Sequence, residues 1–149
     1  MHTDHHQRDA RLNAIYVASR ASLPERPAMW RGLRAAGWDI TSSWIDEAGE
    51  GQTACFTGLW KRIEEEIRRS RGLILYAEEQ DMPLKGALIE CGIALGMGKP
   101  VAVVLPGVRL EPRSMRPVGS WLAHPLVSIH DSLEAAHAAI VNAVQFAAK

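Results

Sequence analysis

Short apolar runs alternate with segments of helical periodicity along most of the chain. Continuous apolar runs at 14–18, 72–77 and 101–105 have the length of strands buried on both faces of a sheet. Two further strands are expected at 38–43 and 125–130, where turn-forming residues flank short apolar stretches. The pattern therefore predicts five short strands.

The segments between these strands have the spacing of helices. The clearest is 53–70, where apolar residues recur every three or four positions, at Phe56, Leu59, Trp60, Ile63 and Ile67. Other helices are expected over 23–36, 83–98 and from 131 onward, each with a capping residue or a proline near its start. Strands and helices thus alternate in a regular order.

Regular alternation of strands and helices is typical of a parallel sheet with helices on both faces. The predicted fold class is α/β: a flavodoxin-like, doubly wound, five-stranded parallel sheet in a three-layer α/β/α arrangement. In such sheets a ligand binds beyond the carboxyl ends of the strands. Functional residues are therefore expected in the loops that follow residues 18, 43, 77 and 105.

Composition narrows the classes of protein that the chain can belong to. Its 149 residues suit one domain, and 47% hydrophobic with 23% charged residues is a globular balance. The 17 basic and 17 acidic residues cancel, which argues against a nucleic-acid partner and against a polybasic membrane anchor. We expect a flexible tail over 1–11 and a single domain over 12–149.

Several features that the sequence lacks bear on the expected location and ligands of the protein. No apolar stretch is long enough to span a membrane, and the N-terminus lacks the apolar region of a secretory signal, so a cytoplasmic location is expected. Cys55 and Cys91 have no partners at metal-ligand spacing, and the loop after 18 lacks a glycine-rich phosphate motif. We therefore expect neither a metal nor a cofactor.

Glu90 is the strongest single candidate for a functional residue. It lies within the apolar helical segment 86–95, where a buried carboxylate costs free energy unless it has partners. Gly86, one helical turn earlier, leaves space in front of the carboxylate for a small molecule. The alternative is that Glu90 faces solvent or caps a neighbouring backbone group.

Two other residues suit acid and base chemistry. Asp81 follows the third strand, at the carboxyl edge of the sheet, and together with Glu90 forms a pair of carboxyl groups. Tyr16 lies inside the first strand, where a buried hydroxyl normally needs a hydrogen-bond partner. A solvated, helix-capping loop for Asp81 and a plain core position for Tyr16 are the alternatives.

Substrate-binding candidates follow the first two strands. Ser19, Arg20 and Ser22 precede a helix, where hydroxyls and a guanidinium can hold an anion. Trp44 follows the second strand and can stack on a planar ring, although a core position is the alternative.

Three segments together resemble the nucleoside 2-deoxyribosyltransferase-like superfamily, which includes nucleoside monophosphate N-glycosidases. They are 15–19, 40–44 and 83–101, and the resemblance extends over about residues 14–140. The last segment carries the most specific signature, formed by Glu90, Gly92, Ala94, Lys99, Pro100 and Val101. The resemblance implies a flavodoxin-like domain that acts at the N-glycosidic bond of a (deoxy)nucleoside or nucleoside monophosphate.

The resemblance also implies roles for individual residues. Glu90 matches the family's nucleophile, which attacks the anomeric carbon, and Tyr16 matches the tyrosine that holds it. Asp81 is the nearest match to an acid that handles the base or sugar. Retaining glycosyl transfer uses such a carboxylate to trap an oxocarbenium-like centre.

The expected partner is a small nucleoside or nucleotide, contacted by Ser19, Arg20, Trp44 and Gly86. Whether the acceptor is a second base or water stays open. The alternatives are a non-catalytic nucleotide-binding or sensing module, with Glu90 as a ribose ligand, and a domain without a small-molecule site. The apolar helix and the family resemblance also predict a homo-oligomer, a dimer or higher.

Overall fold

Four parallel strands form the sheet of this protein. A computed structural model of the chain describes residues 13–47 and 55–147. Within these ranges the strands follow the order β1-β2-β3-β4, and every neighbouring pair is parallel. They are β1 (Ile15–Ala18), β2 (Gly72–Tyr76), β3 (Val101–Val104) and β4 (Val127–His130). The predicted α/β class with a parallel sheet is confirmed, whereas the tail expected over 1–11 lies outside the described residues.

The fifth strand, expected at 38–43, is not confirmed. Ile40 forms only an isolated parallel bridge with Ile15. Beyond it the Ser42 hydroxyl takes over from the backbone, because it accepts a hydrogen bond from the Val17 amide at 2.8 Å. The Trp44 indole N–H donates to the Val17 carbonyl at 2.8 Å. Side chains thus satisfy the edge of β1, and the backbone ladder ends after one bridge.

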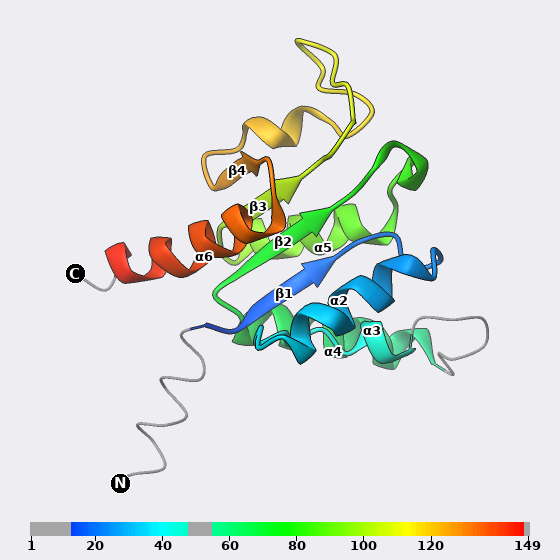
Figure 1. Cartoon of the computed structure of the whole chain (residues 1–149), viewed down its shortest axis with the longest axis vertical. Coiled ribbons are helices and arrows are strands. Elements are labelled where there is room, and N and C mark those ends of the chain that lie inside the picture. The colour runs from blue at the N-terminus through cyan, green and yellow to red at the C-terminus, as the bar shows by residue number, and fades with distance from the viewer. Residues whose placement is uncertain (1–12, 48–54, 148–149) are drawn as a thin grey trace, which may run out of the picture.

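Helices cover both faces of the sheet, which gives three layers (Figure 1). The helices α4 (Phe56–Arg69) and α5 (Gly86–Gly96) pack against each other on one face. The helices α2 (Glu25–Ala35) and α6 (Leu133–Ala147) lie on the other face, and the short α3 (Trp44–Glu47) contacts α2. Two 3-10 turns complete the described elements, η1 (Glu79–Asp81) and η2 (Ser120–Ala123).

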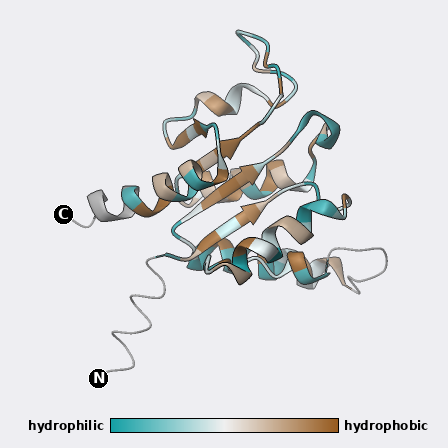
Figure 2. Cartoon of the chain, viewed as in Figure 1, coloured by the Kyte–Doolittle hydropathy of each residue, from teal (hydrophilic) through white to brown (hydrophobic). Residues whose placement is uncertain are grey.

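The strands β1, β2 and β3 form the centre of the core. All residues of β1 and β3 are buried, and hydrophobic residues concentrate on the strands while polar residues lie on the outer helix faces (Figure 2). Gly72 begins β2 where a Cβ atom would lie 2.7 Å from the Pro100 carbonyl and 2.7 Å from the Ile140 side chain. Only glycine therefore allows α6 to pack this closely on the sheet. The edge strand β4 is only partly buried.

The helix that carries Glu90 is shorter than the expected 83–98. It begins at Gly86, so the segment from Pro83 to Lys85 lies outside it as a loop. The isolated bridge at Ile40 lies on one side of β1 and β2 lies on the other, so the chain reverses direction across the sheet at β1. This switch point is where doubly wound sheets bind ligands. No helix in the described ranges has the length and apolar character needed to cross a membrane.

Candidate functional site

Tyr16, inside β1, and Glu90, inside α5, contact each other. Tyr16 is fully buried on β1, and Glu90 on α5 is 6% exposed. The Tyr16 hydroxyl donates a hydrogen bond to Glu90 Oε1, although the two residues are 74 positions apart in the sequence. The Tyr16 hydroxyl and the Glu90 carboxyl group thus supply each other with the hydrogen-bond partner that burial requires.

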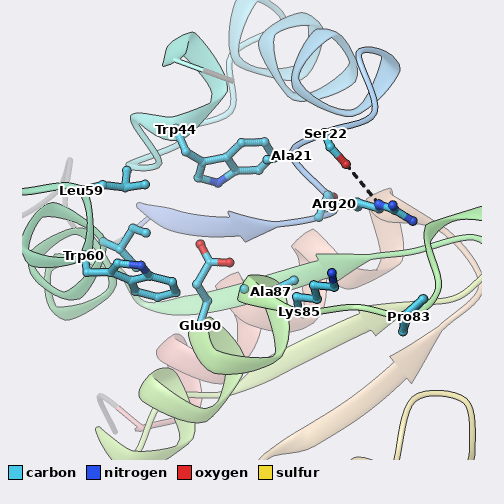
Figure 3. Close-up of a pocket in the computed structure, with 13 residues that line it drawn as sticks. Arg20, Ala21, Ser22, Trp44, Leu59, Trp60, Pro83, Lys85, Ala87 and Glu90 are labelled. Atoms are coloured by element: carbon cyan, nitrogen blue, oxygen red, sulfur yellow. Dashed lines mark hydrogen bonds between the residues drawn. The ribbon is translucent and has the colours of Figure 1, made fainter. Parts of the chain in front are cut away.

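A pocket of about 290 Å³ opens above this pair. Figure 3 shows the Glu90 carboxyl group pointing toward the space between the rings of Trp44 and Trp60. The pocket lies at the switch point of the sheet, between the loop after β1, the helix α4 and the start of α5. Its lining residues are Ser19, Arg20, Ala21, Ser22, Trp44, Leu59, Trp60, Ile63, Pro83, Lys85, Gly86, Ala87 and Glu90.

The pocket has one apolar and one cationic end. Trp44 and Trp60 form the apolar end, and the hydrogen bond from the Trp44 indole to Val17 fixes that ring. Gly86 lies beside Trp60, where an added Cβ atom would be 3.9 Å from the indole ring. Arg20, Ser22 and Lys85 lie toward the other end (Figure 3). A flat, partly apolar and anionic molecule fits these walls.

Burial dominates the electrostatics of Glu90. It raises the pKa of Glu90 to about 8, because the ionised form loses its hydration. The Tyr16 hydrogen bond lowers this pKa, and the negative charge of Glu66 raises it. Burial and the neighbouring Glu90 also hold the pKa of Tyr16 well above its usual value, so its hydroxyl remains a donor.

Ser19 and Arg20 both line the pocket, but they differ in the hydrogen bonds that their side chains already form. The Ser19 hydroxyl donates to the Tyr76 carbonyl at 3.1 Å and accepts from the Trp30 indole at 2.9 Å, so it mainly holds the loop. Arg20 Nε donates to the Ser22 hydroxyl at 3.1 Å. Among the described side chains neither Arg20 nor Lys85 pairs with a carboxylate.

The structure does not bring Asp81 into the pocket. Its side chain is fully buried, and Arg26 binds both carboxylate oxygens, at 2.9 and 2.7 Å. The Glu78 amide donates to the same carboxylate at 2.6 Å, because η1 turns Asp81 back toward its own start. Asp81 is absent from the pocket lining, so its expected contact with the base or sugar is not seen.

Sequence reasoning missed several residues of this site. Lys85 lines the pocket because α5 begins one residue later, a boundary that the apolar pattern does not fix. Trp60 lines it because α4 packs beside α5. Glu66 is another buried carboxylate, 5% exposed, and its place three residues after Ile63 was the available signal.

Metal-ligating side chains do not gather in the part of the chain that the structure describes. No group of three or more His, Cys, Asp and Glu side chains there could hold a metal ion. Cys91 is buried next to Glu90, whereas Cys55 is exposed.

Comparison with known proteins supports the fold. No family model matches the sequence, and no curated protein matches it. Among solved structures the chain is similar to one described as a 2-desoxiribosyltransferase from Leishmania mexicana, with a TM-score of 0.61 and 19% sequence identity. The match covers 87% of this chain and 97% of that chain. At this identity the likeness shows a shared α/β fold, over nearly the whole of the similar protein.

Proposed function

We propose that the protein cleaves the N-glycosidic bond of a (deoxy)nucleoside or nucleoside monophosphate and transfers the sugar to a second base or to water. In this proposal Glu90 is the nucleophile. The observation that carries the proposal is the buried Glu90 carboxyl group, held by Tyr16 at the floor of a small-molecule pocket. The fold shared with a structure described as a deoxyribosyltransferase supports the same class of reaction.

The hydrogen bond from Tyr16 occupies Glu90 Oε1 and leaves Oε2 to react. In the first step Oε2 bonds to the anomeric carbon, the C–N bond breaks, and its electron pair leaves with the base, which takes up a proton from water. The product is a glycosyl ester of Glu90. In the second step a second base or water attacks the anomeric carbon, its proton goes to the hydroxide left by the first step, and the Glu90 carboxylate is freed, with net retention of configuration.

The walls of the pocket suggest how the substrate lies. The base stacks at the apolar end, against Trp44 and Trp60, and the sugar lies over Glu90 beside Gly86. A 5′-phosphate at the other end meets Arg20 and Lys85, two cations that a neutral nucleoside leaves unused. We therefore expect a nucleoside monophosphate to react better than the matching nucleoside.

The experiment is incubation with a panel of nucleosides and their 5′-monophosphates, with and without an added acceptor base, followed by chromatography for free and exchanged base. Glu90→Ala should lower base release by at least about 1,000-fold, because the covalent route is lost. Glu65→Gln, an exposed change on α4, is the matched control and should leave it unchanged. Absence of base release from every substrate by the wild-type protein would contradict the proposal.

A non-catalytic nucleotide-binding module is the second candidate. It is favoured by the raised pKa of Glu90, since a protonated carboxyl group can donate a hydrogen bond to a sugar hydroxyl. It is also favoured by the position of Asp81 outside the pocket. Calorimetric binding of a nucleoside monophosphate without base release, retained in Glu90→Gln, would support this candidate instead.

A further inference from the structure

A second buried carboxylate belongs to the surroundings of this site. Glu66 lies on the face of α4 that carries Ile63, which lines the pocket, and Ile67, which is fully buried. Its side chain is not among the lining residues, so it does not meet a ligand directly. A buried carboxylate carries a large desolvation cost, which calls for specific partners.

The first partner of Glu66 is the backbone that precedes the tryptophan wall. Glu66 Oε1 accepts a hydrogen bond from the Ser43 amide at 3.0 Å. Ser43 immediately precedes Trp44, and the Ser43 carbonyl accepts from the Asp46 amide at 3.1 Å in the first turn of α3. Trp44 is thus held at two points, by the Glu66 anchor and by its own indole bond to Val17.

The second effect of Glu66 is electrostatic. Glu66 lies on α4 and Glu90 on α5, two helices that pack against each other and against β1, and both side chains are buried. The negative charge of Glu66 raises the pKa of both Glu90 and Tyr16. Within the described residues Glu66 forms no ion pair. The other titratable groups around Glu90 are Tyr16 from β1, Cys91 on α5, Lys85 before α5 and Arg20 after β1.

We propose that Glu66 is a positioning residue of the site, which holds the Trp44 wall through the Ser43 amide and places its negative charge within the buried surroundings of Glu90. Both effects are properties of the free protein. Their consequence for turnover rests on the proposed function, because only a nucleophile must be ionised to react.

Two substitutions separate the two effects. Glu66→Gln keeps a carbonyl oxygen for the Ser43 amide and removes the charge, whereas Glu66→Ala removes both. The side-chain carboxyl of Glu90 is followed by carbon-13 NMR between pH 4 and 10, and its signal is assigned by its loss in Glu90→Gln. We expect the Glu90 midpoint to move to lower pH in Glu66→Gln, because the neighbouring negative charge is gone.

Glu65→Gln is the matched control, because Glu65 lies on the same helix but is exposed and pairs with Arg68 at 2.7 Å. The titration midpoint of Glu90 in the Glu65→Gln protein should equal that in the wild type. An unchanged midpoint in Glu66→Gln would overturn the electrostatic half of the proposal, and an equal shift in Glu65→Gln would show that the effect is not specific to Glu66.

The anchoring half is tested on the Trp44 indole N–H, assigned by its loss in Trp44→Phe. Glu66→Ala should speed its hydrogen exchange by about tenfold or more, since the bond to Val17 then opens with the loosened wall. Glu66→Gln should leave the exchange rate near that of the wild type. Equal exchange in all three proteins would overturn the anchor. So would fast exchange in Glu66→Gln, whose folding is checked by circular dichroism.

Kinetics then connect the proposal to catalysis. In an active enzyme the rising limb of kcat/KM against pH should shift with the NMR midpoint in Glu66→Gln, while KM rises only in Glu66→Ala. If the wild-type protein releases no base, the proposed function fails, whereas the NMR and exchange results still decide the role of Glu66.

Discussion

At Glu90 two requirements oppose each other. Burial and the charge of Glu66 favour the protonated acid, whereas the nucleophile of the proposed reaction must be ionised. The Tyr16 hydrogen bond favours the ionised form, and the positive charge that develops at an anomeric carbon would favour it further. The poorly hydrated carboxylate is then a strong partner for that charge, because little water has to be removed when the substrate reacts.

The raised pKa of Glu90 predicts how stability depends on pH. Between about pH 4.5 and about pH 8 the folded protein keeps a proton on Glu90 that the unfolded chain has released, so the free energy of unfolding falls as the pH rises. Glu90→Gln has no such proton, and its carbonyl oxygen can still accept from Tyr16. Urea unfolding from pH 5 to pH 9 should show a shallower fall for Glu90→Gln than for the wild type. Parallel curves would contradict the burial argument.

In an enzyme with the proposed function, Tyr16→Phe should weaken catalysis without abolishing it. The change removes a hydrogen bond to a charged group, which is worth about 1.5 to 3 kcal/mol, so kcat/KM should fall about 10- to 100-fold. Because that bond lowers the pKa of Glu90, its loss should also move the rising limb of the pH profile to higher pH. The measurement is kcat/KM from pH 5 to pH 10. A limb that moves to lower pH would show that Tyr16 does not support the carboxylate.

At the scale of elements, local patterns predicted what each segment is, and distant contacts decided how each ends. The apolar runs correctly predicted β1, β2 and β3, because central parallel strands are buried on both faces. The strand expected at 38–43 shrank to one bridge since hydroxyl and indole groups took its place on β1. For the site, Tyr16 and Glu90 stood out as polar groups in apolar segments, and the structure brings them together.

The position of Asp81 could not be predicted in the same way. Its partner, Arg26, is 55 residues away on α2, and no local pattern links the two. The pair joins α2 to η1, and Arg20 Nη1 also donates to the Asp81 carbonyl at 3.4 Å. The loops that follow β1 and β2 both line the pocket, so this pair fixes their relative position.

Asp81→Asn should therefore mainly lower the free energy of unfolding. The Arg26 and Asp81 side chains are 4% and 0% exposed. The substitution leaves the buried guanidinium with only the more exposed Glu78 carboxylate, at 3.3 Å, as its counter-charge, and should cost about 3 kcal/mol. Asp46→Asn is the control, because its pair with Arg34 is 50% and 40% exposed and contributes at most about 1 kcal/mol. Urea unfolding measures both. If Asp81→Asn keeps full stability and loses base release, Asp81 has the acid role that the family resemblance implied.

At the scale of the whole molecule, one helical layer leaves large apolar side chains in water. Phe56 on α4 is 70% exposed and Ile89 on α5 is 56% exposed. The outward positions of α5 near Ile89 include Gly92 and Gly96, where an added Cβ atom would meet nothing within 4 Å. In a monomer this apolar surface stays in contact with water. A second copy of the chain can cover it, and the glycines allow the two helix backbones to approach closely.

We therefore expect the protein to self-associate through the outer face of α5. Light scattering at micromolar concentration should give a dimer or a higher oligomer, and Ile89→Lys should shift it to the monomer because the charge would be buried in the interface. Ile129→Lys is the matched control, since Ile129 is 52% exposed but lies on β4, at the far edge of the sheet from β1. Because Ile89 is adjacent to Glu90, the Ile89→Lys monomer should also bind a nucleoside monophosphate more weakly if the second copy closes the pocket. A monomeric wild-type protein, or equal dissociation by both lysine substitutions, would rule out this interface.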